Sequence, residues 1–484
     1  MTPPVDPSPA PGRITIVGLG PGDPRHLTVA ARDALAAAPV VHVRTTSFPG
    51  VAAIPASASR VGCDDLYAAH DTFADVYAAI AARVVDAAAR GPVVYAVPGD
   101  PAMGETTVGL VRARAAARGI DVTLLPGVSF VGPTLAALGW DALDGLQIAD
   151  ATDIAARHHP PIDPDRAALV AQVYSRLVAS DVKLVLQNQY PDDHPIHIVA
   201  GAASEAARVT TTTLAALDHA EAFDDVTTLG VPPLARPGSV QSLAEVVAHL
   251  RAPDGCPWDR EQTHQSLRPY LLEEAHEAVA AIDADDPEAL AEELGDVLLQ
   301  VVLHSQLAVE AGDFGLADVV RHITEKLVRR HPHVFGDVQA DTPAEVLKNW
   351  DALKAEEKAA KGTAAVAVDP FADLPATLPA LMRAQAVLRK GAKVVASPAD
   401  GRPADPLADL GAAIDGLAAV AATAPADAAA ALEADDPRAQ AVGQALWAVA
   451  AVARALGVDA ETALRDATAA AERRIRAAIA PSGG

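Results

Sequence analysis

Four acidic side chains at matched spacings could bind a metal ion. Glu274 and Glu277 lie three residues apart in LLEEAHEAV, and Glu293 and Asp296 have the same spacing in EELGD. Residues three apart share one face of a helix, so each pair would present two carboxylates on one side. Four carboxylates held together repel one another unless a cation lies among them, and hard oxygen ligands favour Mg²⁺ or Mn²⁺. The pattern predicts a divalent-metal site if the fold brings the two pairs together.

A helical hairpin would bring them together. Between the pairs lies DADDP (283–287), in which Asp286 can cap a helix and Pro287 suits a first helical position. The inner acids, Glu277 and Glu293, are equally far in sequence from the centre of this segment, and so are the outer two. We therefore expect two antiparallel helices on which the carboxylates meet as two facing pairs.

These acids have more than one interpretation. The four carboxylates could instead be the solvated face of an ordinary helix pair, although their mirror symmetry about the turn favours a metal site. Glu273 lies one residue off the shared face. A solvent-side charge, an outer ligand and a catalytic base are all compatible with its position.

The sequence around these acids resembles that of a known enzyme family. EEAHE (273–277) followed by ELGD (293–296) is similar to the EExxE…ExxD motif of the all-α nucleoside triphosphate pyrophosphohydrolases. Longer stretches narrow the resemblance to the MazG family: CPWDREQTHQSLRPYLLEEAHE (256–277), GDVLLQVVLHSQLA (295–308), EKLVRRHPHVF (325–335) and NWDALKAEEK (349–358). The resemblance implies Mg²⁺- or Mn²⁺-dependent hydrolysis of a nucleoside triphosphate to a monophosphate and diphosphate, with the four acids as metal ligands.

The same resemblance suggests substrate contacts. Lys326 and Arg330, four apart on one helical face, would supply cations for the phosphates, while Trp350 and Lys354 would flank the base and phosphates. Surface charges near a helix end, and a buried role for the tryptophan, are the alternatives. The family likeness also implies a homodimer.

The first half of the chain has a different pattern. Between residues 13 and 235, runs rich in Val, Ile and Leu alternate with amphipathic stretches such as 72–90 and 106–118, which predicts an α/β fold with a largely parallel sheet. The expected strands are 13–20, 39–44, 92–99, 121–127, 182–190 and 196–201.

Glycine-rich turns follow three of these runs, in VGLGPGDPRHLT (17–28), YAVPGDPAMGETT (95–107) and LLPGVSF (124–130). Together they resemble the tetrapyrrole (corrin/porphyrin) methylases, which bind S-adenosylmethionine between two α/β subdomains, and the fusion with a MazG domain is of the YabN-like type. The resemblance implies that the cofactor lies against Gly18, Gly20, Gly22, Gly99, Asp100 and Pro101. Tight turns are the alternative role of the glycines. One alternative is that S-adenosylmethionine-dependent methyl transfer by this domain is the main activity of the chain. VHVRTTSFPG (41–50) departs from the Tyr-Asp pair of typical members, so the domain could instead bind a ligand and regulate its neighbour.

Composition and net charge exclude several classes of protein. The chain has 484 residues and a net charge of −25, which argues against a nucleic-acid groove. Its two cysteines, Cys63 and Cys256, cannot build a disulfide framework. We find neither a signal peptide nor a membrane-spanning apolar run, and the expected location is the cytoplasm.

These patterns predict a multidomain protein. The expected parts are a disordered tail (1–12), the α/β methylase-like domain (13–235), an all-α MazG domain (240–361) and a degenerate all-α second MazG repeat (375–480). In this repeat AVGQ stands where the first has ELGD, so Ala441 and Gln444 replace acids, and Asp415 alone lies near the place of EExxE. We expect this repeat to be a non-catalytic helical partner.

Overall fold

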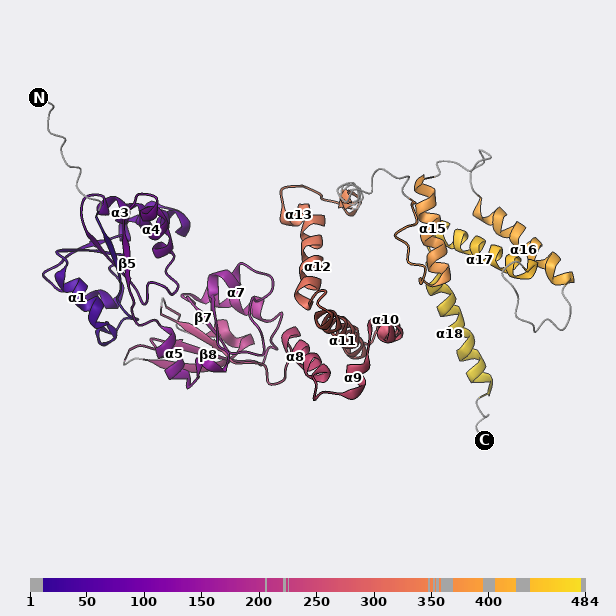
Figure 1. Cartoon of the computed structure of the whole chain (residues 1–484), viewed down its shortest axis with the longest axis horizontal. Coiled ribbons are helices and arrows are strands. Elements are labelled where there is room, and N and C mark those ends of the chain that lie inside the picture. Colours follow the sequence, from indigo (N-terminus) through magenta and orange to yellow (C-terminus); the bar gives the residue numbers. More distant parts are fainter. Residues whose placement is uncertain are drawn as a thin grey trace, which may run out of the picture. The chain divides into compact units, whose positions relative to one another are not determined.

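The computed structural model describes residues 12–204, 207–220, 223–224, 226–346, 349–350, 353, 357, 369–394, 405–423 and 436–479. The expected tail therefore lies outside the described residues, apart from Gly12. The chain divides into two compact units, Met1–Val320 and Arg321–Gly484. Figure 1 shows the elements of both units.

The first unit begins with a parallel five-stranded sheet in the order β3-β2-β4-β1-β5. Its strands are β1 (Ile14–Gly18), β2 (Val40–Val43), β3 (Ser59–Gly62), β4 (Val93–Val97) and β5 (Val122–Leu125), and its helices are η1 (Pro24–His26), α1 (Val29–Ala37), η2 (Pro49–Ala53), α2 (Asp64–Ala69), α3 (Phe73–Ala88) and α4 (Thr106–Ala116). Successive residues of β1 face opposite sides, so Ile16 joins a core with α3 and α4 while Val17 joins a core with α1. Helices thus cover both faces, as a parallel sheet requires.

A second five-stranded sheet follows in the order β6-β7-β10-β8-β9. Its elements are α5 (Val131–Leu138), η3 (Ala142–Asp144), β6 (Gln147–Asp150), α6 (Ala151–Ala155), β7 (Ala168–Ala171), α7 (Arg176–Leu186), β8 (Pro195–Ala200), β9 (Arg208–Thr213), η4 (Leu214–His219) and β10 (Thr228–Val231). Only β6 and β7 pair in parallel; β7–β10, β10–β8 and β8–β9 are antiparallel. The expectation of a largely parallel sheet is correct for the first sheet and wrong for the second.

The strand expected at 182–190 is also wrong, because most of this segment belongs to helix α7. Ser175 caps the helix by accepting a hydrogen bond from the N–H of Val178. Val178, Val182 and Val185 are buried at helical spacing against the second sheet. A short run of valines and leucines has the same composition in a buried strand and in a helix, and here the cap and the three- and four-residue spacing decide.

Four helices complete the first unit: α8 (Val240–Arg251), α9 (Pro257–Glu261), α10 (His264–Ala284) and α11 (Pro287–Ala311). Helix α8 packs on α11, and Val247, Leu267, Val302 and Leu303 form their shared core. Asp165, between the second sheet's β6 and β7, accepts hydrogen bonds from the N–H groups of Gly238 and Ser239 at the start of α8. This carboxylate joins the α/β part to the helical part.

The second unit is helical in the part that the structure describes. Its helices are most of α12 (Leu316–Arg330), then α13 (Pro332–Phe335), α15 (Ala380–Val394), α16 (Pro406–Thr423), α17 (Pro437–Ala455) and α18 (Ala460–Ile479). Helices α16 and α17 pack together, and α15 packs on α17 and α18. Within the described ranges no single helix is long and apolar enough to cross a membrane, although α17 and Ala460–Arg476, which are bent by 106° at their junction, pass that test as a pair.

Candidate metal and nucleotide site

The turn between α10 and α11 has the features expected from its sequence. Helix α10 ends at Asp285, which adopts a left-handed conformation with a φ of 54°. Asp286 then caps α11, because its carboxylate accepts hydrogen bonds from the N–H groups of Glu288 and Ala289, both at 3.1 Å. Pro287 occupies the first helical position. The two helices pack extensively along their length, so the predicted helical hairpin is confirmed.

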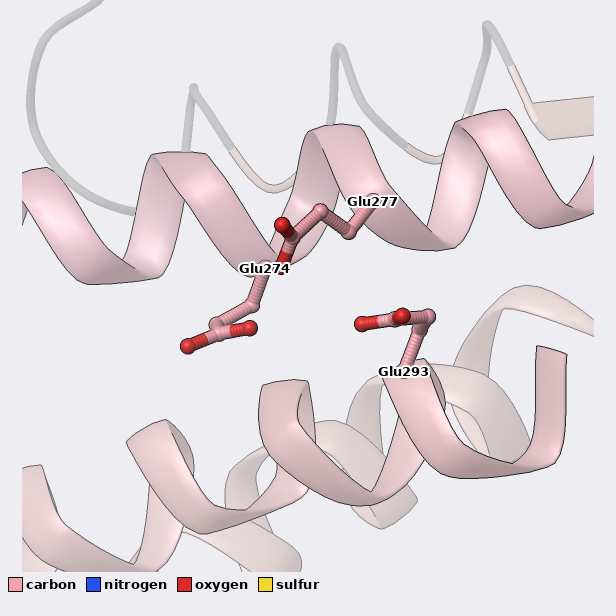
Figure 2. A group of neighbouring side chains, drawn as sticks. All are labelled: Glu274, Glu277 and Glu293. Carbon is pink, nitrogen blue, oxygen red and sulfur yellow. The ribbon is translucent and has the colours of Figure 1, made fainter. Parts of the chain in front are cut away.

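Three of the predicted ligands come together across this hairpin. Carboxylate oxygens of Glu274, Glu277 and Glu293 all lie within 4.8 Å of one another. Figure 2 shows Glu274 and Glu277 on one helix and Glu293 on the facing helix, with the side chain of Glu277 bent toward Glu274. Glu277 is exposed, and the other two are half-buried. Three carboxylate groups at this separation offer the hard oxygen donors that Mg²⁺ and Mn²⁺ prefer.

The electrostatics of the cluster follow from like charges. Partial burial and then the charge of Asp296, with Glu277 acting next, raise the pKa of Glu274. Partial burial and then the charges of Glu277 and Asp296 raise the pKa of Glu293. Both shifts disfavour the ionised form, and a divalent cation among these oxygens would reverse them. The donor set therefore fits a divalent metal ion.

Asp296 and Glu273 lie at the margin of the cluster. Asp296 is half-buried on α11 and is outside the trio, yet its charge acts on both Glu274 and Glu293. Glu273 is exposed on α10, and its charge is a small contribution to the raised pKa of Glu274. The structure thus places all four predicted ligands in one electrostatic group, whereas the role of Glu273 stays a prediction.

The expected substrate residues belong to the second unit. Lys326 is exposed on α12, and Lys354 lies outside the described residues. Arg330 is less open than its expected role suggests, since its side chain is 19% exposed and is paired with Glu357. Its Nε and Nη2 donate hydrogen bonds to the two carboxylate oxygens at 3.2 and 2.6 Å. Glu357 was not singled out from sequence, although its position seven residues after Trp350 places it on the same face of a helix.

Trp350 joins the same neighbourhood. The ring of His331 meets it edge-on, with 5.3 Å between centroids. The indole Nε1 of Trp350 and the Nδ1 of His333 are buried without a hydrogen-bond partner in the described part of the chain. The C-terminal end of α12 therefore collects arginine, histidine and tryptophan side chains, which are groups that can contact phosphates and bases.

In the first unit, the glycine-rich turns converge at the carboxyl ends of β1, β4 and β5. Gly20 and Gly99 exchange two backbone hydrogen bonds of 3.1 and 2.8 Å, and both have a positive φ. A Cβ on Gly18 would lie 2.6 Å from the carbonyl oxygen of Gly99 and 2.7 Å from the Cα of Gly127. This close approach explains why glycine is needed here. Gly127, in the third turn, was not among the predicted contacts.

The other expected cofactor contacts differ in their surroundings. The Asp100 carboxylate is bound to the backbone: it accepts hydrogen bonds from the N–H groups of Gly127 and Ala102 at 2.9 and 2.7 Å. Pro101 is buried, and Gly22 has a φ of 129° in the first turn. The turns thus form a tightly packed edge at the place where open α/β sheets bind ligands.

Next to this edge is the segment that departs from the methylase pattern. Arg44, directly after β2, pairs with Glu105 at 3.3 Å, and the side chain of that glutamate is only 4% exposed. Burial raises the pKa of Glu105, and the charge of Arg44 opposes this shift. Glu105 also accepts a hydrogen bond of 2.6 Å from the hydroxyl of Thr107. A largely buried ion pair, whose two charges offset each other, therefore lies beside the glycine-rich turns.

The degenerate repeat falls on the packed pair α16 and α17. Asp415 lies on α16, and Ala441 and Gln444 lie on α17. Within the described ranges, the only group of three or more His, Cys, Asp or Glu side chains arranged to hold a metal ion is the trio on α10 and α11. The expectation that this repeat carries no metal site stays a prediction.

Comparisons with known proteins find both halves of the chain. The MazG nucleotide pyrophosphohydrolase domain family matches residues 262–335, and the tetrapyrrole (corrin/porphyrin) methylases match residues 13–218. The uncharacterized protein YabN of Bacillus subtilis is 39% identical over 383 residues, which are 77% of this chain and 76% of that protein.

Two enzymes match the C-terminal half. The nucleoside triphosphate pyrophosphohydrolase of Escherichia coli K12 is 41% identical over 49% of this chain and 86% of its own length. The nucleoside triphosphate pyrophosphohydrolase/pyrophosphatase MazG of Thermotoga maritima is 38% identical over 47% of this chain and 80% of its own length. The chain belongs to the MazG nucleoside triphosphate pyrophosphohydrolase family, in the YabN-like form that carries an N-terminal tetrapyrrole methylase domain.

Proposed function

We propose that this protein hydrolyses nucleoside triphosphates to nucleoside monophosphates and diphosphate with Mg²⁺ held by Glu274, Glu277, Glu293 and Asp296. The observation that carries the proposal is the approach of three of these carboxylates to within 4.8 Å across the α10–α11 hairpin. Mn²⁺ is the alternative ion, because it accepts the same ligands. The names of the Escherichia coli and Thermotoga maritima relatives support the substrate class.

Each of the proposed site residues would have a separate role in the hydrolysis. When bound, the cation would neutralise the triphosphate and increase the acidity of an attacking water. The carboxylate trio would orient that ion, and Glu273 would accept a proton from the water as a base. Lys326 and Arg330 would balance the charge of the phosphates, and Trp350 would contact the base.

Pyrophosphate release from a panel of ribo- and deoxyribonucleoside triphosphates tests this proposal. We expect release with Mg²⁺, none with chelator, and a loss of at least about a hundredfold in Glu277→Gln and Asp296→Asn. Glu288→Gln, an exposed acid on the same helix, is the matched control and keeps full activity. Unchanged release in Asp296→Asn would show that the metal is held elsewhere.

A second function is supported by the packing of the glycine-rich turns. We propose that this edge binds S-adenosylmethionine, since the mutual approach of Gly18, Gly99 and Gly127 leaves no room for side chains between the loops. Calorimetry with S-adenosylmethionine should show binding to the wild-type chain and none to Gly127→Val, whose circular dichroism must remain native. An absence of heat with the wild-type chain would leave ligand-controlled regulation of the neighbouring domain as the alternative.

A further inference from the structure

Two arginines at the C-terminal end of α12 share the carboxylate of Glu357, which lies later in the chain. Arg330 donates from Nε and Nη2 to Glu357, and Arg329 donates from Nε to Oε1 of the same group at 2.9 Å. Hydrogen bonds from Arg330 and then from Arg329 lower the pKa of Glu357 to about 2. The carboxylate is therefore ionised throughout the neutral range, and the cluster of three side chains retains one net positive charge.

The pairing of Arg330 with Glu357 uses only one edge of the guanidinium. A guanidinium has five N–H donors, and the pairing with Glu357 uses the edge formed by Nε and Nη2. The two N–H groups of Nη1 and the second N–H of Nη2 have no partner in the described part of the chain. Such an edge matches two oxygens of a phosphate, whereas an ammonium offers only a point charge.

The surroundings of the pair reduce its freedom further. The side chains of Arg330 and Glu357 are 19% and 21% exposed, while that of Arg329 is 52% exposed. His331, the next residue, donates its backbone N–H to Leu327 at 3.1 Å and packs its ring on Trp350. Contacts seven residues apart, at Trp350 and Glu357, thus attach one helical face to the end of α12.

We propose that Glu357 is a positioning residue for nucleotide hydrolysis, which orients the guanidinium of Arg330 so that its free edge binds a phosphate of the substrate. This inference rests on the proposed function, because Arg330 acquires its role from nucleoside triphosphate as substrate. It adds a residue that does not contact the substrate and acts through another side chain. The opposite possibility is that Glu357 masks Arg330 and must be displaced by the phosphate, and the two make opposite predictions.

Steady-state kinetics of the full chain with Mg²⁺ separate them. For Glu357→Gln we expect kcat to fall about tenfold without a rise in KM, because orientation is lost while a negative charge near the substrate is removed. The kcat of Arg330→Lys, which keeps the positive charge but loses the planar guanidinium, should fall by at least as much. The kcat of the double variant should be no lower than that of Arg330→Lys alone, because Glu357 acts through Arg330.

Controls identify a merely structural effect. Glu472→Gln breaks an exposed Glu–Arg pair of 2.7 Å on α18 in the same unit, and it should leave kcat and KM unchanged. The Mg²⁺ concentration at half-maximal rate should be equal in wild type and Glu357→Gln. Faster hydrolysis in Glu357→Gln would establish masking and overturn the proposal, as would additive losses in the double variant.

A binding measurement keeps the inference testable apart from hydrolysis. Calorimetry with an α,β-methylene nucleoside triphosphate and Mg²⁺ should show about tenfold weaker binding in Arg330→Lys, and Glu357→Gln should add nothing to that loss in the double variant. If wild type releases no pyrophosphate, the proposed function fails, and the same calorimetry still decides on Glu357. Equal affinity in wild type and Arg330→Lys would show that Glu357 orients no phosphate-binding group.

Discussion

At the scale of single residues, the acidic trio proposed to bind metal lowers the stability of the metal-free protein. Glu274 and Glu293 both have a raised pKa, caused first by partial burial and then by neighbouring carboxylates. A raised pKa of an acid means that the folded protein binds protons more tightly than the unfolded chain. In the absence of metal, the free energy of unfolding therefore falls as pH rises above about 4.5 through the raised pKa values.

Neutralising one member of the trio should relieve this repulsion. In chelator at pH 7, we expect Glu277→Gln to unfold at a temperature equal to or above that of wild type, and the difference to shrink as pH is lowered toward 4.5. With Mg²⁺, wild type should gain thermal stability by mass action and the variant should not. Thermal unfolding followed by circular dichroism measures both effects. A clearly lower unfolding temperature of the variant in chelator would argue against electrostatic strain in the cluster.

At the scale of elements, the α10–α11 turn sets which carboxylates face each other. The left-handed Asp285 ends one helix, and Asp286 caps the next directly. One inserted or deleted residue would rotate α11 by about 100° around its axis and turn Glu293 away from its partners. The turn therefore determines the geometry of the proposed metal site, although none of its residues is a proposed ligand.

Removing the cap should weaken the hairpin. Asp286→Ala loses the acceptor for the N–H groups of Glu288 and Ala289, and we expect a loss of about 1 kcal/mol in the free energy of unfolding. Asp285→Asn is the matched control, because asparagine also tolerates the left-handed conformation. Urea unfolding measures both variants. Equal losses in the two would mean that the cap is not what stabilises this turn.

At the scale of the whole molecule, the two functional halves meet in the first unit through Asp165. Partial burial alone would raise the pKa of this aspartate, but hydrogen bonds from Ser242, Gly238 and Ser239 outweigh it and lower the pKa to about 2. Because the folded-state pKa is depressed, the stabilisation is complete above the usual aspartate pKa near 4 and is lost as pH falls toward 2. Helix α8 is thus held by the α/β part while it shares a hydrophobic core with α10 and α11.

Replacing this aspartate should loosen the connection. Asp165→Asn places an amide donor among three donors, so we expect a lower unfolding temperature at pH 7 and faster proteolysis of the segment 232–238. Asp193→Asn, an exposed aspartate of the same domain, is the control. Protease cleavage followed by mass spectrometry locates the change. Unaltered cleavage in Asp165→Asn would show that other contacts hold α8.

Signals within about one helical turn were predictable from the residues. The spacing of the four acids, the cap at Asp286 and the glycine-rich turns are local, and the structure contains the predicted hairpin and turns. The strand predicted at 182–190 is wrong because this composition suits a strand and a helix equally. The cap at Ser175 and the helical spacing of the valines that pack on the second sheet make most of the segment part of α7. Strand direction in that sheet also escaped prediction, since pairing depends on partners far away in sequence.

The sequence by itself determined which residue types stand at which spacing, and hence the four acids proposed as metal ligands, the helical hairpin and the glycine turns. Only the tertiary structure decided how far the acids approach, that Asp296 acts on the trio from its margin, and that Gly127 closes on Gly18 and Gly99. It also showed that Arg330 is already paired with Glu357. The physical reason is common to all of these. Helix faces and caps depend on neighbours along the chain, whereas distances and partners between elements depend on packing.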